Sequence, residues 1–254
     1  MTIAKTLAMA LDPVWMARAA GYEPDNWQAE VLRRRAQQTI LLCTRQGGKS
    51  LTTALLSVHE ALFHPPALVL LFARAKRQSE LLYAQVRLIL RELGETATSY
   101  EKETESELVL TNGSKVVCLP GNEATTRGYS GVRLLVIDEA ARCPDLLYEA
   151  CRPTLAVSGG RLVLLSTPWG RRGFFFESWT NGGPAWHRVR VTAPECPRIP
   201  AGWLAQERES LPERVFRQEY LTSFEDLDSQ AFPTDLVIQA FTQDVQPLFL
   251  GGVR

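Results

Sequence analysis

The 254-residue sequence is poor in histidine, has no excess of either charge and contains no long hydrophobic run. Its three histidines and five scattered cysteines, without a C-x-x-C pair, argue against a zinc site, and we expect free thiols in a reducing compartment. Basic and acidic residues number 28 each, so net charge neither favours nor excludes a nucleic-acid partner, and any DNA-binding surface must be local. No apolar run reaches the roughly 18 residues of a membrane-spanning helix, so no membrane partner is expected.

What the sequence does contain is an alternation of short apolar runs and helical patterns. The apolar runs predict buried strands at 39–44, 67–73, 134–138 and 161–166. Apolar residues at helical spacing predict helices over 49–63 and 76–93. Strands that alternate with helices form mainly parallel sheets through right-handed crossovers. The expected fold class is therefore α/β, with a mainly parallel central sheet flanked by helices.

Three further segments add detail to this expectation. An Asn-Gly pair between two strand-like runs predicts a β-hairpin over 107–119. The run WHRVRVT, from Trp186, predicts an edge strand, and short helices are expected around 203–210 and 212–221. Asp12 and Pro13 interrupt the apolar N-terminus, which we interpret as a helix of the mature protein and not as a signal peptide.

The stretch ILLCTRQGGKSL (40–51) joins a predicted strand to a predicted helix. Its Gly48, Lys49 and Ser50 match the end of the phosphate-binding P-loop, G-x-x-x-x-G-K-[ST], but Cys43 replaces the first glycine. A P-loop surrounds phosphates with backbone N–H groups and a helix N-terminus, while its lysine adds charge and its hydroxyl helps to hold Mg²⁺. The backbone comes closest to phosphate at the last glycine, so a small residue at the strand end is compatible with binding. The predicted nucleotide-binding residues of this loop are Thr44, Arg45, Gln46, Gly47, Gly48, Lys49 and Ser50.

Two later strands end in polar residues that suit such a site. LLVID ends at Asp138, a predicted Mg²⁺ ligand together with Ser50, and Glu139 follows as a predicted general base for the attacking water. The strand RLVLLS runs into Ser166, Thr167 and Pro168, a segment predicted to sense the γ-phosphate and to couple its loss to other elements. The alternatives are a carboxylate pair that caps the next helix and an ordinary strand-to-turn junction.

Together, TRQGGKS (44–50), LLVIDEA (134–140), STPWG (166–170) and FRQEYLTSF (216–224) resemble the ATPase domain of the large terminase subunit of tailed double-stranded DNA bacteriophages. The resemblance extends from about Gly21 to Phe224, and its most specific parts are the R-Q-x-G-K-S form of the loop and the FRQEY segment. The family often lacks the first P-loop glycine. The resemblance implies a P-loop NTPase of the ASCE, RecA-like type, with ATP and Mg²⁺ as cofactors.

The resemblance also implies roles for single residues. Gln28, in GYEPDNWQAEVL (21–32), would read the edge of the adenine base, with Tyr22 or Trp27 stacked on it. Arg45 would act near the phosphates of its own subunit. Arg127 would be an arginine finger given to the ATP of a neighbouring subunit, where its charge stabilises the phosphoryl transition state.

Arg133, at the start of a strand, is the local alternative to Arg127 and is expected to be structural. The catalytic set implied by the motifs is Glu139, Lys49, Arg127 and Arg45.

The implied organisation has three parts. Residues 1–185 would form the ATPase core with an N-terminal helical extension, and 186–225 a lid subdomain in which Arg217, Gln218 and Glu219 couple hydrolysis to motion. Residues 226–254 would be a linker toward a nuclease domain of the ribonuclease-H type, whose first strand PLFLGGVR resembles. Because the sequence ends before the metal-binding aspartate of that strand, nuclease activity is not expected from this chain.

The function implied by the resemblance is ATP-driven translocation of double-stranded DNA into a procapsid, in the host cytoplasm. Its partners would be the portal protein and the small terminase subunit, in a homo-oligomeric ring on the procapsid or as a monomer in isolation. A helicase-like ATPase is one alternative, but it needs a second RecA-like domain for which the sequence after residue 185 is too short. A non-hydrolysing nucleotide-binding assembly protein is the other, and the intact Lys49, Asp138 and Glu139 argue against it.

Overall fold

The fold is built on one eight-stranded sheet. The computed structural model describes residues 3–94, 100–120, 128–226 and 234–240. The strand order is β3-β4-β5-β2-β6-β7-β1-β8. The strands are β1 (Gln38–Cys43), β2 (Leu68–Ala73), β3 (Tyr100–Glu103), β4 (Glu107–Leu110), β5 (Lys115–Pro120), β6 (Leu134–Asp138), β7 (Arg161–Ser166) and β8 (Trp186–Val191).

Most of the sheet is parallel. All neighbouring pairs from β5 to β8 in the sheet order are parallel, and only β3 and β4 add an antiparallel edge. The antiparallel pair β4–β5 confirms the predicted hairpin. The predicted α/β class with a mainly parallel sheet is therefore confirmed.

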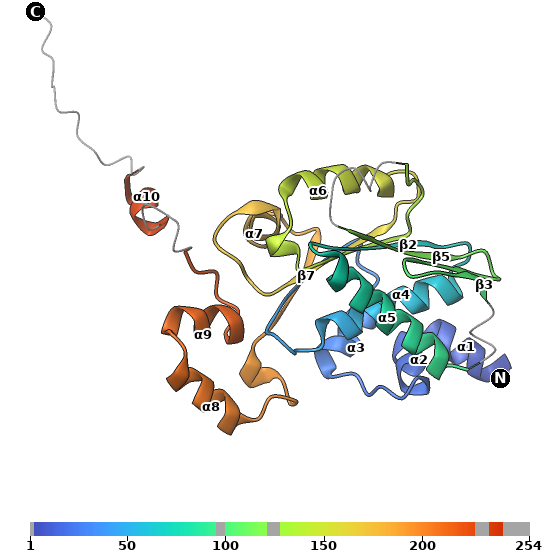
Figure 1. Cartoon of the computed structure of the whole chain (residues 1–254), viewed down its shortest axis with the longest axis horizontal. Coiled ribbons are helices and arrows are strands. Elements are labelled where there is room, and N and C mark those ends of the chain that lie inside the picture. The colour runs from blue at the N-terminus through green and yellow to red at the C-terminus, as the bar shows by residue number, and fades with distance from the viewer. Residues whose placement is uncertain (1–2, 95–99, 121–127, 227–233, 241–254) are drawn as a thin grey trace, which may run out of the picture.

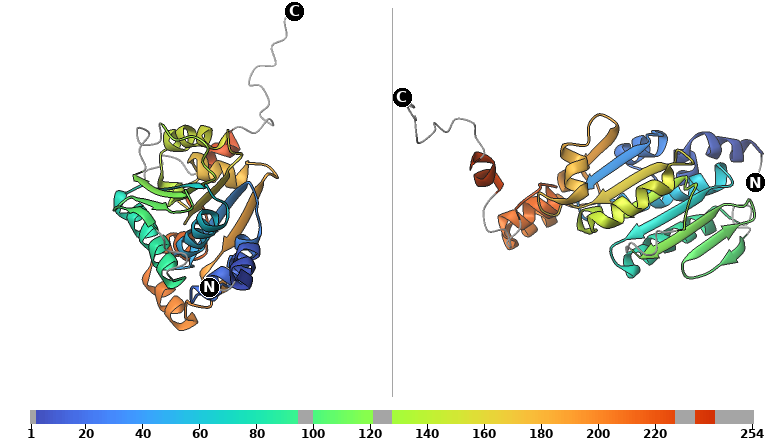
Figure 2. Two further views of the ribbon diagram at one scale, coloured as in Figure 1. Left: turned by 90° about the vertical axis from the view of Figure 1, so that its right-hand side faces the viewer. Right: turned by 90° about the horizontal axis from the view of Figure 1, so that it is seen from above.

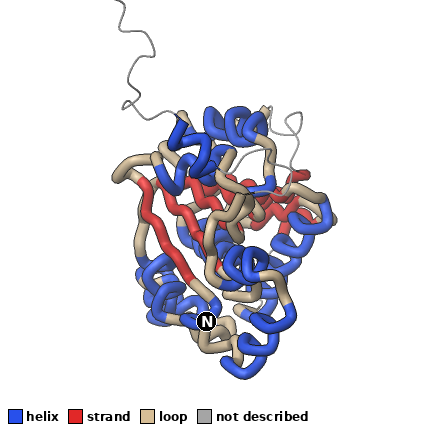
Figure 3. Tube along the Cα trace, turned by 90° about the vertical axis from the view of Figure 1, so that its left-hand side faces the viewer, coloured by secondary structure: helices blue, strands red, loops and turns tan. Residues whose placement is uncertain are grey.

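Helices cover both faces of the sheet (Figure 1). One face carries α1 (Ile3–Leu11), α2 (Pro13–Ala19), α3 (Asn26–Arg33), α4 (Lys49–Phe63) and α5 (Lys76–Glu92). The other carries α6 (Asp145–Cys151) and α7 (Gly173–Thr180). The tube view shows the strands between these two helical layers (Figure 3). Each face has its own apolar core, because the buried strands alternate their side chains between the two faces.

Two more helices, α8 (Ala201–Ser210) and α9 (Glu213–Tyr220), lie beyond the sheet at the side where β1 ends (Figure 2). They pack on each other around Phe216 and Tyr220. Helix α10 (Thr234–Ala240) follows them. None of the described helices is long and apolar enough to cross a membrane.

The first residues of the predicted lid belong to the sheet, and the predicted division into core, lid and linker stays a prediction. The predicted lid began at residue 186, but β8 pairs in parallel with β1 along its whole length and forms the edge of the central sheet. The sheet therefore ends at Val191, and only the helical part of the predicted lid lies outside it. The predicted linker, 226–254, falls mostly outside the described residues.

Candidate functional site

The predicted P-loop joins β1 to α4 at the carboxyl edge of the sheet. Cys43 is the last residue of β1, fully buried, and burial raises the pKa of its thiol to about 12, so it remains a neutral packing residue. Gly48 precedes α4 with a φ of 91°. A Cβ atom there would lie 2.7 Å from Nε2 of Gln28 and 2.9 Å from Nη2 of Arg198. The backbone conformation therefore favours glycine, and a Cβ atom would displace the ends of these two side chains.

The loop is held by segments from both ends of the chain. Thr44 donates its N–H to the Val191 carbonyl at the end of β8 (2.9 Å). Arg198 donates through Nη2 to the Gly47 carbonyl (2.7 Å), while its Nη1 pairs with Asp25 (2.7 Å). These contacts connect the loop to the end of β8 and, through Arg198, to Asp25.

Five side chains from three adjacent strand ends meet beside this loop. Ser50 Oγ donates to Oδ2 of Asp138 (3.4 Å), and Lys49 Nζ lies 3.6 Å from Oε1 of Glu139. Ser166, at the end of β7, donates to Oε2 of Glu139 (3.4 Å). Members of the predicted nucleotide-binding, metal-binding, catalytic and coupling sets therefore lie together, as expected at the carboxyl edge of a parallel sheet.

The two carboxylates differ in environment. Asp138 is 7% exposed, and its burial and the neighbouring charge of Glu139 raise its pKa to about 6, partly offset by Lys49 and by hydrogen bonds from Ser50 and the Glu139 N–H. Glu139 has a left-handed backbone, with φ of 50° and ψ of 41°, which is uncommon for a residue with a side chain. This conformation turns the chain sharply from β6 into the next segment.

This arrangement fits a phosphate and a hard cation. Among the described residues, the N–H groups of Gly48, Lys49 and Ser50 have no protein acceptor and lie at the start of α4. Such groups bind anions together with the positive end of the helix dipole. The hydroxyl of Ser50 and the carboxylate of Asp138 are oxygen ligands of the kind that Mg²⁺ prefers.

Arg45 of the loop points toward the helical part of the predicted lid. Its Nε lies 2.6 Å from Oε2 of Glu219 on α9, and the Glu219 carbonyl accepts from Oγ1 of Thr44 (3.0 Å). Of the three residues predicted to couple lid and site, Glu219 therefore contacts the loop directly. Gln218 is buried beside it, and Arg217 pairs with Glu225 (3.1 Å).

Gln28 does not present an open edge to a ligand in this structure. It is 2% exposed, its Nε2 donates to the Gly48 carbonyl (3.2 Å) and to Oγ1 of Thr52 (3.0 Å), and its Oε1 accepts from the Asp25 N–H (2.9 Å). The amide therefore ties α3 to the P-loop. Its predicted contact with the base stays a prediction.

The remaining predicted residues are the two candidate arginines, Arg127 and Arg133, and the coupling segment after β7. Arg127 lies outside the described residues. Its alternative, Arg133, donates through Nε to the buried Glu60 (2.8 Å), as expected of a structural residue. Thr167 is buried directly after Ser166. The coupling roles of Thr167 and Pro168 stay predictions.

Sequence reasoning missed two arginines at the site, Arg142 and Arg198. Arg142 lies three residues after Glu139 and contacts both Glu139 and Glu219. Its spacing from Glu139 was a usable signal, because residues three apart in a helical turn share a face. Arg198 carried no such signal, since it reaches the loop from a segment far along the chain.

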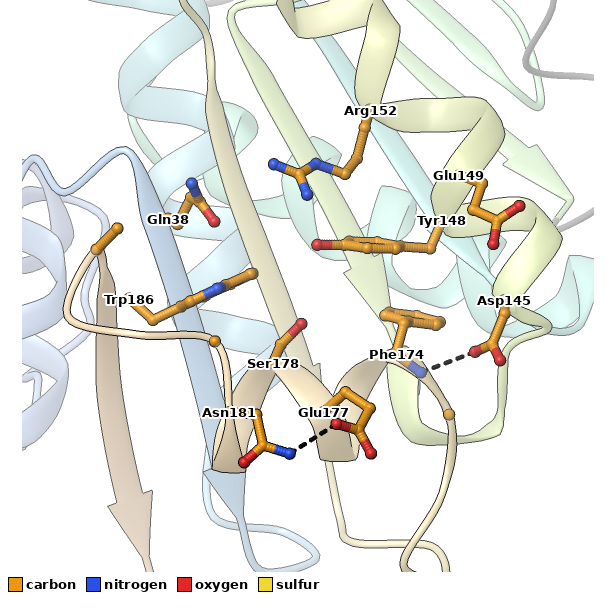
Figure 4. A pocket seen from close by; sticks show the side chains of 13 residues that line it. Gln38, Asp145, Tyr148, Glu149, Arg152, Phe174, Glu177, Ser178, Asn181 and Trp186 are labelled. Carbon is orange, nitrogen blue, oxygen red and sulfur yellow. Dashed lines mark hydrogen bonds between the residues drawn. The ribbon is translucent and has the colours of Figure 1, made fainter.

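A cavity of about 690 Å³ lies away from this site, near the amino end of β1 (Figure 4). It is lined by Gln38, Arg152, Trp186 and the stacked rings of Tyr148 and Phe174. None of the predicted site residues lines it. Asp138, Glu139 and Ser50 open instead into a separate cavity of about 450 Å³ along α5.

The comparisons with known proteins agree with this geometry. The family model of the N-terminal part of terminase large subunits of the T4-like-virus type matches residues 40–237. The large terminase subunit of Thermus virus P23-45 is 27% identical over 238 residues, which cover 80% of this chain and 49% of that protein. That of Escherichia phage T5 is 26% identical over 199 residues, 75% of this chain and 44% of that protein. The chain therefore spans about half the length of the curated relatives it matches.

Solved structures give the same result for the fold. The large terminase ATPase domain of Thermus phage P74-26 superposes with a TM-score of 0.72 at 23% identity, covering 82% of this chain and 96% of that one. A large terminase from another thermophilic bacteriophage, in complex with ADP, superposes with a TM-score of 0.65 at 12% identity, covering 79% and 54%. With a family model matched over most of its length and this shared fold, the chain belongs to the terminase large subunit family, whose N-terminal domain it represents.

Proposed function

We propose that this chain hydrolyses ATP as the motor domain of a viral DNA-packaging terminase. One observation carries the proposal. Lys49 and Ser50 of the loop lie 3.6 and 3.4 Å from Glu139 and Asp138, so the phosphate-binding loop and the carboxylate pair form one site. Because a binding loop alone would need no carboxylate beside its lysine, this pairing favours hydrolysis.

In the proposed mechanism, the phosphates of ATP bind the free N–H groups of the loop, and Lys49 exchanges Glu139 for a phosphate oxygen. Glu139 then accepts a proton from the attacking water. The water oxygen bonds to the γ-phosphorus while the bond to the β–γ bridging oxygen breaks, and ADP leaves with that electron pair. Ser50 and Asp138 would hold Mg²⁺, which would neutralise phosphate charge.

Family membership and the ADP complex of the thermophilic-phage terminase support the rest of the proposal. The chain would move duplex DNA into a procapsid with the portal protein and the small terminase subunit, in the host cytoplasm. Arg127 would enter the site of the next copy in a ring, whereas the isolated chain would be a monomer. Gln28 would read the adenine, and Ser166 to Pro168 would couple phosphate loss to motion.

The test measures ATP turnover per chain against protein concentration, with Mg²⁺, for the wild type, Arg127→Ala, Glu139→Ala and an equal mixture of the two variants. We expect turnover to rise with concentration and to fall at least about 100-fold in each variant. The mixture should recover part of it, because one intact shared site can form between unlike copies.

Full turnover in Glu139→Ala would reject the hydrolytic mechanism. Concentration-independent turnover that survives Arg127→Ala would reject the shared site and leave an ATPase with all its catalytic groups in one chain.

A further inference from the structure

The side chain of Arg142 occupies a position between the catalytic carboxylate and the helix α9. Arg142 ends the short 3₁₀ turn Ala140–Arg142 that follows β6, and its side chain is 18% exposed. Its Nε lies 3.9 Å from Oε2 of Glu139, and its Nη2 lies 3.5 Å from Oε1 of Glu219. One planar cation thus faces a carboxylate from each of two elements.

An aromatic ring fixes the guanidinium from a third side. The centre of the Trp169 ring lies 3.7 Å from Cζ of Arg142, a close cation–π contact. Trp169 directly follows the predicted coupling segment Ser166–Pro168. Because a guanidinium is planar and rigid, stacking on the ring and two carboxylates together define its orientation in a way that a lysine could not reproduce.

The Glu139 carboxylate needs a second cation to hold it in place. The backbone of Glu139 is left-handed, and among the described residues its carboxylate makes polar contacts with Lys49, Ser166 and Arg142. In the proposed mechanism Lys49 leaves Glu139 for the phosphates. Arg142 is then the only cation among the described residues that still contacts the carboxylate.

We propose that Arg142 is a positioning residue that holds the Glu139 carboxylate in its reactive orientation, with Trp169 as its platform and Glu219 as its link to α9. The proposal rests on the proposed ATP hydrolysis. It assigns Trp169 a role in rate, although this side chain touches no reacting atom. Glu219 is shared with Arg45, so one carboxylate of α9 contacts both the loop and Arg142.

The test uses the full chain and separates kcat from the binding of nucleotide. We expect Arg142→Gln to lower kcat roughly 10- to 100-fold, because a misplaced base loses its near-attack geometry, while the KM for ATP and the Kd for ADP stay within about twofold. Arg152→Gln is the matched control, since Arg152 also lies over an aromatic ring, that of Tyr148, but contacts none of the catalytic residues that the structure describes. Thermal unfolding of each variant reports on the fold.

The platform is tested by a second pair of variants. Trp169→Leu should lower kcat, and Trp169→Phe, which keeps a ring, should restore most of it. In the Arg142→Gln background, Trp169→Leu should have no further effect, since the ring acts through the guanidinium. A fully additive double variant would overturn the platform role.

Glu139→Gln distinguishes failure of the proposed ATP hydrolysis from failure of the positioning role of Arg142. Turnover that survives this change rejects the proposed function. A dead Glu139→Gln with kcat unchanged in folded Arg142→Gln rejects the positioning role alone. An Arg142→Gln variant that raises KM and the Kd for ADP in proportion would also reject it, because that result assigns Arg142 to binding.

Discussion

At the scale of single residues, the buried carboxylate of Asp138 lowers the stability of the folded chain. It is almost fully buried, and the only cation near it among the described residues is Lys49, which also faces Glu139. Burial and the neighbouring carboxylate raise its pKa to about 6. In the nucleotide-free chain at neutral pH, an ionised Asp138 therefore disfavours the folded state.

The residue-scale prediction concerns Asp138→Asn. The folded pKa, about 6, exceeds the ordinary value of 3.8, so the favourable contribution of protonated Asp138 is complete below about pH 4 and is lost as pH rises through 6. An amide of the same shape carries no such loss. We expect the variant to raise the free energy of unfolding by about 2–3 kcal/mol at pH 7.5 and to change it little at pH 4.

Urea unfolding of the nucleotide-free protein without Mg²⁺, at both pH values, measures this difference. Turnover with Mg²⁺ and ATP should be lost in the same variant. A destabilised Asp138→Asn at pH 7.5, or an equal gain at both pH values, would contradict the burial argument.

At the scale of elements, helix α4 is anchored at both ends by different chemistry. Its start belongs to the P-loop, while its last turn carries Glu60, 1% exposed, at the opposite edge of the sheet. Glu60 accepts from Arg133 before β6 (2.8 Å) and lies 3.8 Å from Arg161 of β7 and 4.0 Å from Arg35. One carboxylate therefore joins α4 to two strands.

The element-scale prediction is that Glu60→Gln lowers the free energy of unfolding by about 3–5 kcal/mol, because removal of a buried charge leaves its partners uncompensated. Glu80→Gln is the control, since Glu80 forms an exposed pair with Lys76 on α5 and should change stability by less than about 0.5 kcal/mol. Denaturant titration measures both. An equal effect of the two changes would show that the Glu60 contacts contribute no more than a surface pair.

Elements with strong local signals were predictable from the sequence. Helix α4 begins and ends as predicted, at Lys49 and Phe63, because the P-loop pattern marks its start and His64-Pro65-Pro66 ends it. The strand β8 was correctly expected at an edge, but its membership of the central sheet was not. That membership depends on pairing with β1, and no local pattern encodes a partner so distant in sequence.

The residues of the site also differ in how far the sequence predicts their positions. Lys49, Ser50, Asp138 and Glu139 were predictable as neighbours, since parallel strands place their carboxyl ends at one edge. The internal use of the Gln28 amide was not, because it depends on how α3 packs on α4. Arg142 gains its role only when α9 and Trp169 approach it in three dimensions.

At the scale of the whole molecule, the two edges of the sheet have separate tasks. The carboxyl edge carries the loop, the carboxylates and the contact with α9. The amino edge carries the Glu60 contacts and the cavity beside Gln38. Substitutions at the amino edge can therefore stabilise the fold without altering the catalytic residues at the carboxyl edge.

The position of β1 in the sheet also sets the order in which a newly made chain can become functional. Its two neighbours, β7 and β8, come from residues 161–166 and 186–191, although β1 itself is synthesised early. Pairings between such distant segments form late and slowly. A nascent chain released from the ribosome only as far as residue 180 has the complete P-loop sequence but no β8 to hold it. The P-loop therefore gains its support from β8 only after nearly the whole domain has been translated.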